Sequence, residues 1–104
     1  MARTPIHPGE ILADELQELG LSASAVAEML DVPANRITQI INGKRAVTAD
    51  TALRLSRWLG TSAELWINLQ KVYELDLARQ ESGKAIRKSV RPLPDSMRSH
   101  PNHS

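Results

Sequence analysis

The residues that could do chemistry in this sequence gather in one short stretch, between Asn35 and Arg45. At about 100° per residue on a helix, Ile37, Ile40 and Ile41 fall together on one face. Amide and hydroxyl side chains fall on the opposite face, and they are Asn35, Thr38, Gln39 and Asn42. The spacing therefore predicts a short helix with one buried face and one face that carries hydrogen-bonding groups.

The chemistry of the hydrogen-bonding face points to nucleic acid. A face that is merely solvated is more often built from Glu and Lys, which favour helix more than Asn and Thr do. Asn and Gln can make bidentate hydrogen bonds to adenine, and Thr can hydrogen-bond a base or contact the thymine methyl group. The sequence thus predicts base reading in the major groove by Asn35, Thr38, Gln39 and Asn42. A polar helix surface without a ligand is the alternative.

Basic residues flank this helix and supply candidate phosphate contacts. Arg36 lies at its side, and Lys44 and Arg45 follow its end, so these three residues are predicted to contact DNA phosphates. The whole chain carries a net charge of only +1. Its charges are nevertheless segregated, since residues 1–35 hold six acids and one base, whereas residues 36–57 hold five bases and one acid. This asymmetry suggests separate surfaces for separate partners.

The elements that must position these residues are helices. Apolar residues follow the helical period and no stretch alternates like a strand, so an all-α fold is predicted. Five helices are expected, at about residues 8–19, 22–30, 33–42, 49–59 and 63–80. Leu55 and Leu59 in the fourth helix are expected to be buried. The residues expected to be buried in the first four helices also include Ile11, Leu12, Leu16, Leu19, Val26, Ala27, Met29, Leu30 and Leu53.

Length and composition place these helices in one small domain. The 104 residues suffice for a single modest core. Residues 82–104 contain three prolines, few large apolar residues and five bases against one acid. We therefore predict a helix-turn-helix DNA-binding and dimerisation domain over residues 1–81 and a basic, poorly ordered tail over residues 82–104.

Several function classes are excluded by what the sequence lacks. It contains no cysteine, which rules out disulfides, iron–sulfur clusters and thiolate zinc sites. No apolar run approaches the length of a membrane span, and the prediction is a soluble, cytoplasmic protein without a membrane partner. His100 and His103 have the spacing of a metal pair but no third ligand nearby, so no metal is predicted. No catalytic grouping or cofactor motif is present, and the chain is not expected to be an enzyme.

Spacing ahead of the polar helix resembles the helix-turn-helix of the lambda-repressor/Cro-like (XRE) family. Ala27 is small where two helices would cross, and Asp31 follows four residues later at the turn. The family usually has Gly at this turn, where φ is often positive. Asp tolerates that left-handed region better than most residues do. The resemblance covers about residues 23–42 and implies a five-helix lambda-repressor-like domain.

Three longer stretches narrow the resemblance to HigA-type antitoxins. They are "HPGEIL" at residues 7–12, "NGKRAVTADTALRLSRWLGTS" at residues 42–62 and "ELWINLQ" at residues 64–70. The resemblance covers about residues 5–80. It implies a homodimer that represses its own operon by binding operator DNA. It also implies that the protein binds a RelE-like endoribonuclease toxin and holds it inactive.

The fifth predicted helix carries enough apolar surface both to pack its own domain and to pair with a second copy. Its apolar residues form two stripes, and the resemblance to a dimeric family assigns dimerisation to them. The predicted dimerisation residues are Leu65, Trp66, Leu69, Val72, Tyr73 and Leu77. The alternative is that all of them face the core of a monomer.

Two other functions are compatible with the sequence. A stand-alone repressor of the phage type would share the DNA-reading face but lack a toxin, and only a neighbouring gene for a small basic protein would separate the two. A protein-interaction module that has lost DNA binding would show no salt-dependent affinity for any duplex.

Overall fold

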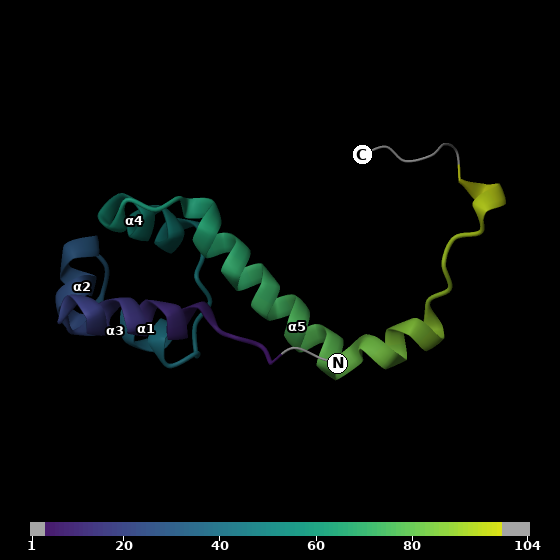
Figure 1. The fold of residues 1–104 in the computed structure, drawn as a ribbon, viewed down its shortest axis with the longest axis horizontal. Helices are drawn as coiled ribbons and strands as arrows, with labels where there is room; N and C mark the ends of the chain where they lie inside the picture. The colour runs from purple at the N-terminus through teal and green to yellow at the C-terminus, as the bar shows by residue number, and fades with distance from the viewer. Residues whose placement is uncertain (1–3, 99–104) are drawn as a thin grey trace.

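A computed structural model describes residues 4–98 of the chain, and within that range the regular structure is helical throughout (Figure 1). The prediction of an all-α fold with five helices is confirmed. The elements are α1 (Pro8–Leu19), α2 (Ala23–Leu30), α3 (Ala34–Ile41), α4 (Ala49–Leu59), α5 (Ala63–Ser89) and the short 3-10 helix η1 (Asp95–Met97).

Capping residues explain where these helices begin and end. Ser22, Thr48 and Ser62 precede α2, α4 and α5, and each side-chain oxygen accepts a hydrogen bond from a backbone N–H of the first helical turn. Gly20 and Gly60 end α1 and α4 in the left-handed conformation that glycine adopts without a Cβ penalty. The first four helices therefore fall within a residue or two of their predicted positions.

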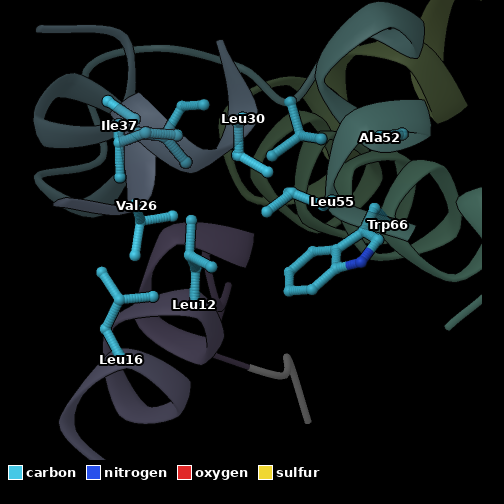
Figure 2. Close-up of a cluster of buried hydrophobic side chains, with 11 residues drawn as sticks. Leu12, Leu16, Val26, Leu30, Ile37, Ala52, Leu55 and Trp66 are labelled. Atoms are coloured by element: carbon cyan, nitrogen blue, oxygen red, sulfur yellow. The ribbon is translucent and has the colours of Figure 1, made fainter. Parts of the chain in front are cut away.

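The hydrophobic core lies where α1 to α4 meet the start of α5 (Figure 2). Trp66 enters it from α5 and is 2% exposed, with its indole N–H donating to Thr61 Oγ1 at 3.2 Å. Eleven apolar residues form the buried cluster, and they are Leu12, Leu16, Val26, Ala27, Leu30, Ile37, Ile40, Val47, Ala52, Leu55 and Trp66. The two buried isoleucines fix α3 from behind and leave its opposite side at the surface.

Four residues expected in the core are exposed instead. Ile11 lies about 100° around α1 from buried Leu12, and Leu19 is the last residue of α1; they are 36% and 49% exposed. Met29 is exposed because it lies about 100° around α2 from buried Leu30. Leu53 lies about 200° around α4 from buried Leu55, on the far side of that helix, and is 62% exposed.

The fifth helix is longer than predicted. Its expected end was near Gln80, but it continues to Ser89, so the proposed boundary at residue 82 falls inside α5. Gly83 within a helix costs only about 1 kcal/mol relative to Ala. The helix formers after it, such as Lys84 and Ala85, sustain the helix. With 27 residues α5 is about 40 Å long, and Figure 1 shows it running away from the other helices.

The start of α1 depends on all four residues of "HPGE". The imidazole Nδ1 of His7 accepts a hydrogen bond from the Gly9 backbone N–H at 2.9 Å, and a Glu10 carboxylate oxygen accepts one from the His7 backbone N–H at 3.3 Å. Pro8 occupies the first helical position, where its missing N–H costs nothing. A Cβ on Gly9 would lie 1.8 Å from the carbonyl oxygen of Ile40. Only glycine therefore allows α1 to approach α3 this closely.

Replacing Gly9 with Ala should destabilise the protein, because the new methyl group would push α1 away from α3. Overpacking of this kind typically costs about 1–3 kcal/mol, and the obstacle here is backbone. Gly83→Ala is the matched control, since a Cβ there meets only side-chain atoms at 3.7 Å or more. It should stabilise by about 0.5–1 kcal/mol through helix propensity. Urea unfolding of both variants measures the difference, and equal stabilities would contradict the close approach.

Candidate nucleic-acid interface

The outer side of α3 presents the four predicted base-reading residues to solvent. Asn35, Thr38, Gln39 and Asn42 are all exposed, whereas the isoleucines at positions 37 and 40 are fully buried. The Thr38 hydroxyl donates to the Ala34 carbonyl at 3.4 Å, a long contact that leaves its oxygen available to a partner. The geometry meets the requirement of a major-groove reading helix, which is an exposed polar face on a fixed support.

The turn between α2 and α3 sets the angle between these two helices. Asp31 adopts the left-handed conformation with φ of 59°, in agreement with the role that the sequence predicted for it. The Val32 N–H then donates to the Ala27 carbonyl at 3.0 Å. Ala27 is 1% exposed, so the small side chain lies where the two helices pack against each other. Together these residues form the helix-turn-helix unit.

An ion-pair network braces this turn from α4. The Arg54 guanidinium donates to the carbonyl oxygens of Leu30 and Asp31 at 2.8 and 3.2 Å, and it pairs with Asp50 at 3.0 Å. Asp50 also pairs with Arg36 at 2.7 Å. The hydrogen bonds from Arg54 and Arg36 hold the pKa of Asp50 below its usual value. Arg36, a predicted phosphate contact, is thus joined to a carboxylate at the side of α3.

Sequence reasoning did not assign a role to Arg54. The sequence feature that could have pointed to Arg54 is its spacing from Asp50, which places opposite charges one helical turn apart. That spacing is common on solvated helices, and the contacts with the turn lie 23 and 24 residues away in sequence.

The loop after α3 carries Lys44 and Arg45 and is fastened at both ends. Gly43 turns the chain with φ of 73°, and the Lys44 N–H donates to the Gln39 carbonyl at 2.8 Å. At the other end, the Gln70 side chain from α5 accepts a hydrogen bond from the Val47 N–H at 2.8 Å. Both basic side chains are exposed, and the Arg45 guanidinium donates to Gln39 Oε1 at 3.2 Å.

Gln70 is a second positioning residue that the sequence reasoning missed. It is only 5% exposed, and its amide nitrogen donates to Glu74 at 2.9 Å, which lowers the pKa of the Glu74 carboxyl together with Lys71. A buried amide with both ends paired is costly to replace, because the Val47 N–H would lose its partner. Gln70 therefore links α5 to the loop that carries the basic residues.

His7 connects the same loop to α1 and α5. Its ring lies edge-on to Tyr73 with centroids 4.8 Å apart, and a Cβ on Gly43 would lie 3.9 Å from the His7 Cγ, so the ring adjoins the loop. Burial lowers the pKa of His7, while the Glu10 carboxylate and the Arg45 backbone oppose that shift. The neutral imidazole is therefore favoured, and its Nδ1 can accept the Gly9 N–H.

The predicted dimerisation residues divide into three groups by their exposure. Trp66 is a core residue at 2% exposure, so the prediction that it forms a dimer contact is wrong: its side chain fills the space between α4 and α1. Tyr73 is half-buried against His7, and Leu69 and Leu77 are half-buried as well. Leu65 and Val72 are exposed at 42% and 41%.

Exposed apolar residues continue this surface beyond the predicted set. Leu75 on α5 and Ile6 ahead of α1 are about half exposed, at 52% and 51%. A shallow hollow between the N-terminal segment and α5 is lined by Thr4, Ile6, Ile11, Leu69, Val72 and Asp76. We call the exposed residues Ile6, Ile11, Leu65, Val72 and Leu75 the α1–α5 apolar surface.

Comparison with known proteins identifies the family. The helix-turn-helix family model HTH_3 matches residues 12–66, which span α1 to the start of α5. Virulence-associated protein I of Dichelobacter nodosus is 51% identical over 77 residues, covering 73% of this chain and 71% of that protein. The chain belongs to the helix-turn-helix family.

Solved structures place it among HigA-type, XRE-family members. An addiction module antidote protein of the HigA family from Coxiella burnetii is 52% identical with a TM-score of 0.86, over 88% of this chain and all of that one. The Pseudomonas aeruginosa antitoxin HigA, solved with the higBA promoter, is 44% identical with a TM-score of 0.85 over the same shares. The predicted family is confirmed, and this is a family of regulators rather than enzymes.

Residues 4–98 lack two features that would point to other functions. Within that range, no three His, Cys, Asp or Glu side chains lie close enough together to hold a metal ion. No helix there combines the length and the apolar character that crossing a membrane requires. His100 and His103, considered above as a metal pair, lie outside the described residues.

Acidification should weaken the fold through His7. Because burial lowers the pKa of His7 in the folded state, the unfolded chain binds this proton more readily. The contribution of His7 to stability is therefore complete above pH 6.5 and is lost as the pH falls through the folded-state pKa. His7→Asn keeps a capping oxygen but does not titrate, and its stability should change less over the same range. If the free energies of unfolding of the two proteins, measured in urea, depend on pH in the same way, His7 is not the source of the loss of stability.

Proposed function

We propose that this protein is the antitoxin of a toxin–antitoxin pair and represses its own operon as a sequence-specific DNA-binding dimer. The observation that carries the DNA-binding role is the exposed, uncharged, hydrogen-bonding face of α3, held by buried isoleucines and braced at both ends. The antitoxin role is supported by the likeness to HigA-family structures over 88% of the chain. Both roles fit a cytoplasmic protein.

In this proposal the two kinds of DNA contact come from different elements. Asn35, Thr38, Gln39 and Asn42 reach base edges from α3, because their side chains donate and accept hydrogen bonds. Lys44 contacts a phosphate from the following loop, where its ammonium group is exposed. Arg36 contacts a phosphate with the N–H groups that its pairing with Asp50 leaves over. The chain thereby combines sequence reading with an electrostatic anchor.

Dimerisation follows from the need to read two half-sites. One eight-residue helix reads only a few base pairs, so two copies set about 34 Å apart reinforce each other. The α1–α5 apolar surface is the proposed seam, together with the half-buried Leu69 and Leu77. Exposed apolar residues that share one region of a small domain mark an interaction surface.

The proposed toxin is a RelE-like endoribonuclease. A nuclease that acts on RNA presents basic residues to the phosphate backbone. The first two helices of this chain expose acids that would complement such a surface, and they are Glu10, Asp14, Glu15, Glu18 and Glu28. Opposite charges of this kind favour rapid encounter and correct orientation.

Val72→Glu should convert the dimer into a folded monomer. Val72 is exposed within one chain, so its replacement leaves the core intact, but a carboxylate in an apolar seam would have to be desolvated opposite its twin. Operator binding should fall much more than binding to random duplex, because half-site reinforcement is lost. Light scattering and gel shifts measure both effects. Leu53→Glu, at a more exposed leucine on α4, is the control and should stay dimeric. If the Val72→Glu protein stays dimeric, the dimer contact lies on another surface.

Co-expression with the neighbouring gene tests both proposed roles and separates them. Wild-type protein should rescue growth from the toxin, co-purify with it and repress a reporter driven by the shared promoter. Asn35→Ala should weaken operator binding by roughly 1–3 kcal/mol and relieve repression, yet still rescue growth. Repression without any toxin rescue would favour a stand-alone repressor of the phage type. Rescue without salt-dependent DNA binding would favour a pure interaction module.

A further inference from the structure

Gln39 and Arg45 contact each other, although the sequence assigned them to different parts of DNA. Gln39 lies on the outer face of α3, and Arg45 lies in the loop that follows. The turn at Gly43 brings them together, with the Lys44 N–H bonded to the Gln39 carbonyl at 2.8 Å. The Arg45 guanidinium then donates to Gln39 Oε1 at 3.2 Å, and both side chains are exposed.

The backbone that carries Arg45 is fixed from two directions. Gln70, which is 5% exposed, accepts a hydrogen bond from the Val47 N–H at 2.8 Å on one side of Arg45. On the other side, the Lys44 N–H donates to the Gln39 carbonyl at 2.8 Å. The loop therefore holds the Arg45 guanidinium beside Gln39, at the edge of the polar face of α3.

This contact changes what Gln39 can recognise. A glutamine that reads adenine uses its amide nitrogen to donate to N7 and its amide oxygen to accept from the 6-amino group. Here the amide oxygen already accepts from a cation, and that cation repels a further amino group. What remains outward is the amide NH2 and the unused guanidinium N–H groups, which are all donors. In the major groove guanine presents two acceptors, N7 and O6.

We propose that Gln39 and Arg45 form one reading unit that selects guanine, with Arg45 acting at the base edge instead of at a phosphate. This inference rests on the proposed DNA-binding function. It assigns Arg45 as a specificity-determining residue and replaces adenine by guanine as the base that Gln39 reads.

The test uses the full-length protein and a randomised 30-base-pair duplex library as the probe. Wild-type protein should enrich a site with guanine at one position of each half-site, preferred over adenine by about 5- to 150-fold, the range of a good bidentate contact. Arg45→Met keeps an unbranched, flexible side chain and removes the guanidinium. With the amide oxygen released, its preference at that same position should shift to adenine, while the other positions keep theirs.

Two further variants separate charge from geometry. Lys44→Met removes one positive charge from the adjacent residue, so it should weaken binding to all duplexes and leave the guanine preference intact. Arg45→Lys keeps the charge but loses the planar fork, so it should retain affinity for random duplex and lose most of the guanine preference. Circular dichroism should show unchanged helix content in all three variants, since the substituted side chains are exposed.

The outcomes are distinguishable. If Arg45→Met weakens every duplex equally and leaves the base preferences unchanged, Arg45 is a phosphate contact and the reading unit is wrong. Adenine at the Gln39 position of the wild-type site would overturn it as well. If the wild-type protein enriches no sequence at all, the proposed DNA-binding function itself fails. Enrichment of guanine at that position with a shift in Arg45→Met supports the inference.

Discussion

The reading helix depends on a close contact behind it, between the first turn of α1 and the end of α3. The Ile40 carbonyl oxygen occupies the space where a side chain on Gly9 would begin. The backbones of the two helices are therefore in direct contact at Gly9. His7 and Glu10 cap the same turn reciprocally, and this fixes the direction in which α1 starts. Because α3 has only eight residues, it could not hold its own orientation without such support.

Two buried polar side chains also fix the position of the loop that bears the basic residues. His7 lies beside Gly43 and packs edge-on against Tyr73, and Gln70 accepts the Val47 N–H, so the loop adjoins α1 and α5 at once. The helix that exposes apolar surface and the loop that adjoins the reading face therefore belong to one rigid arrangement. In a dimer built on α5, the separation of the two reading helices would be set by these ties rather than by a flexible linker.

Local patterns gave the fold and the reading face because they depend on neighbours in sequence. Serine and threonine caps, left-handed glycines and the isoleucine spacing of α3 each act over a few residues, and the structure follows them. What could not be predicted depends on distant partners. Gln70 looks like a solvated position on an amphipathic helix until Val47, 23 residues away, is placed beside it. Arg54 looks like half of an ordinary helical ion pair until it meets the carbonyls at the α2–α3 turn.

The predicted extent of burial is wrong for a related reason. A helical period tells which residues share a face but not how wide a face the neighbours cover. Met29 and Leu53 were therefore placed in the core, although α2 and α4 bury narrower stripes than the sequence allows. The prediction for Trp66 is wrong in the opposite sense, because this residue is more buried than expected. The sequence pattern predicts that its stripe on α5 faces a second copy, but α5 contacts α4 and α1 along that side, and the large indole fills the space between them.

The neutrality of the reading face explains why so much of the chain serves to hold it still. A charged side chain attracts phosphate over several ångströms and from many directions, so it needs little positioning. Amide and hydroxyl groups gain from a base edge only at hydrogen-bond distance and near-linear geometry. A protein with a net charge of +1 cannot rely on bulk attraction to DNA. Its discrimination must come from directional bonds, and those require the glycine contact, the caps and the buried amide that fix α3 and its loop in one place.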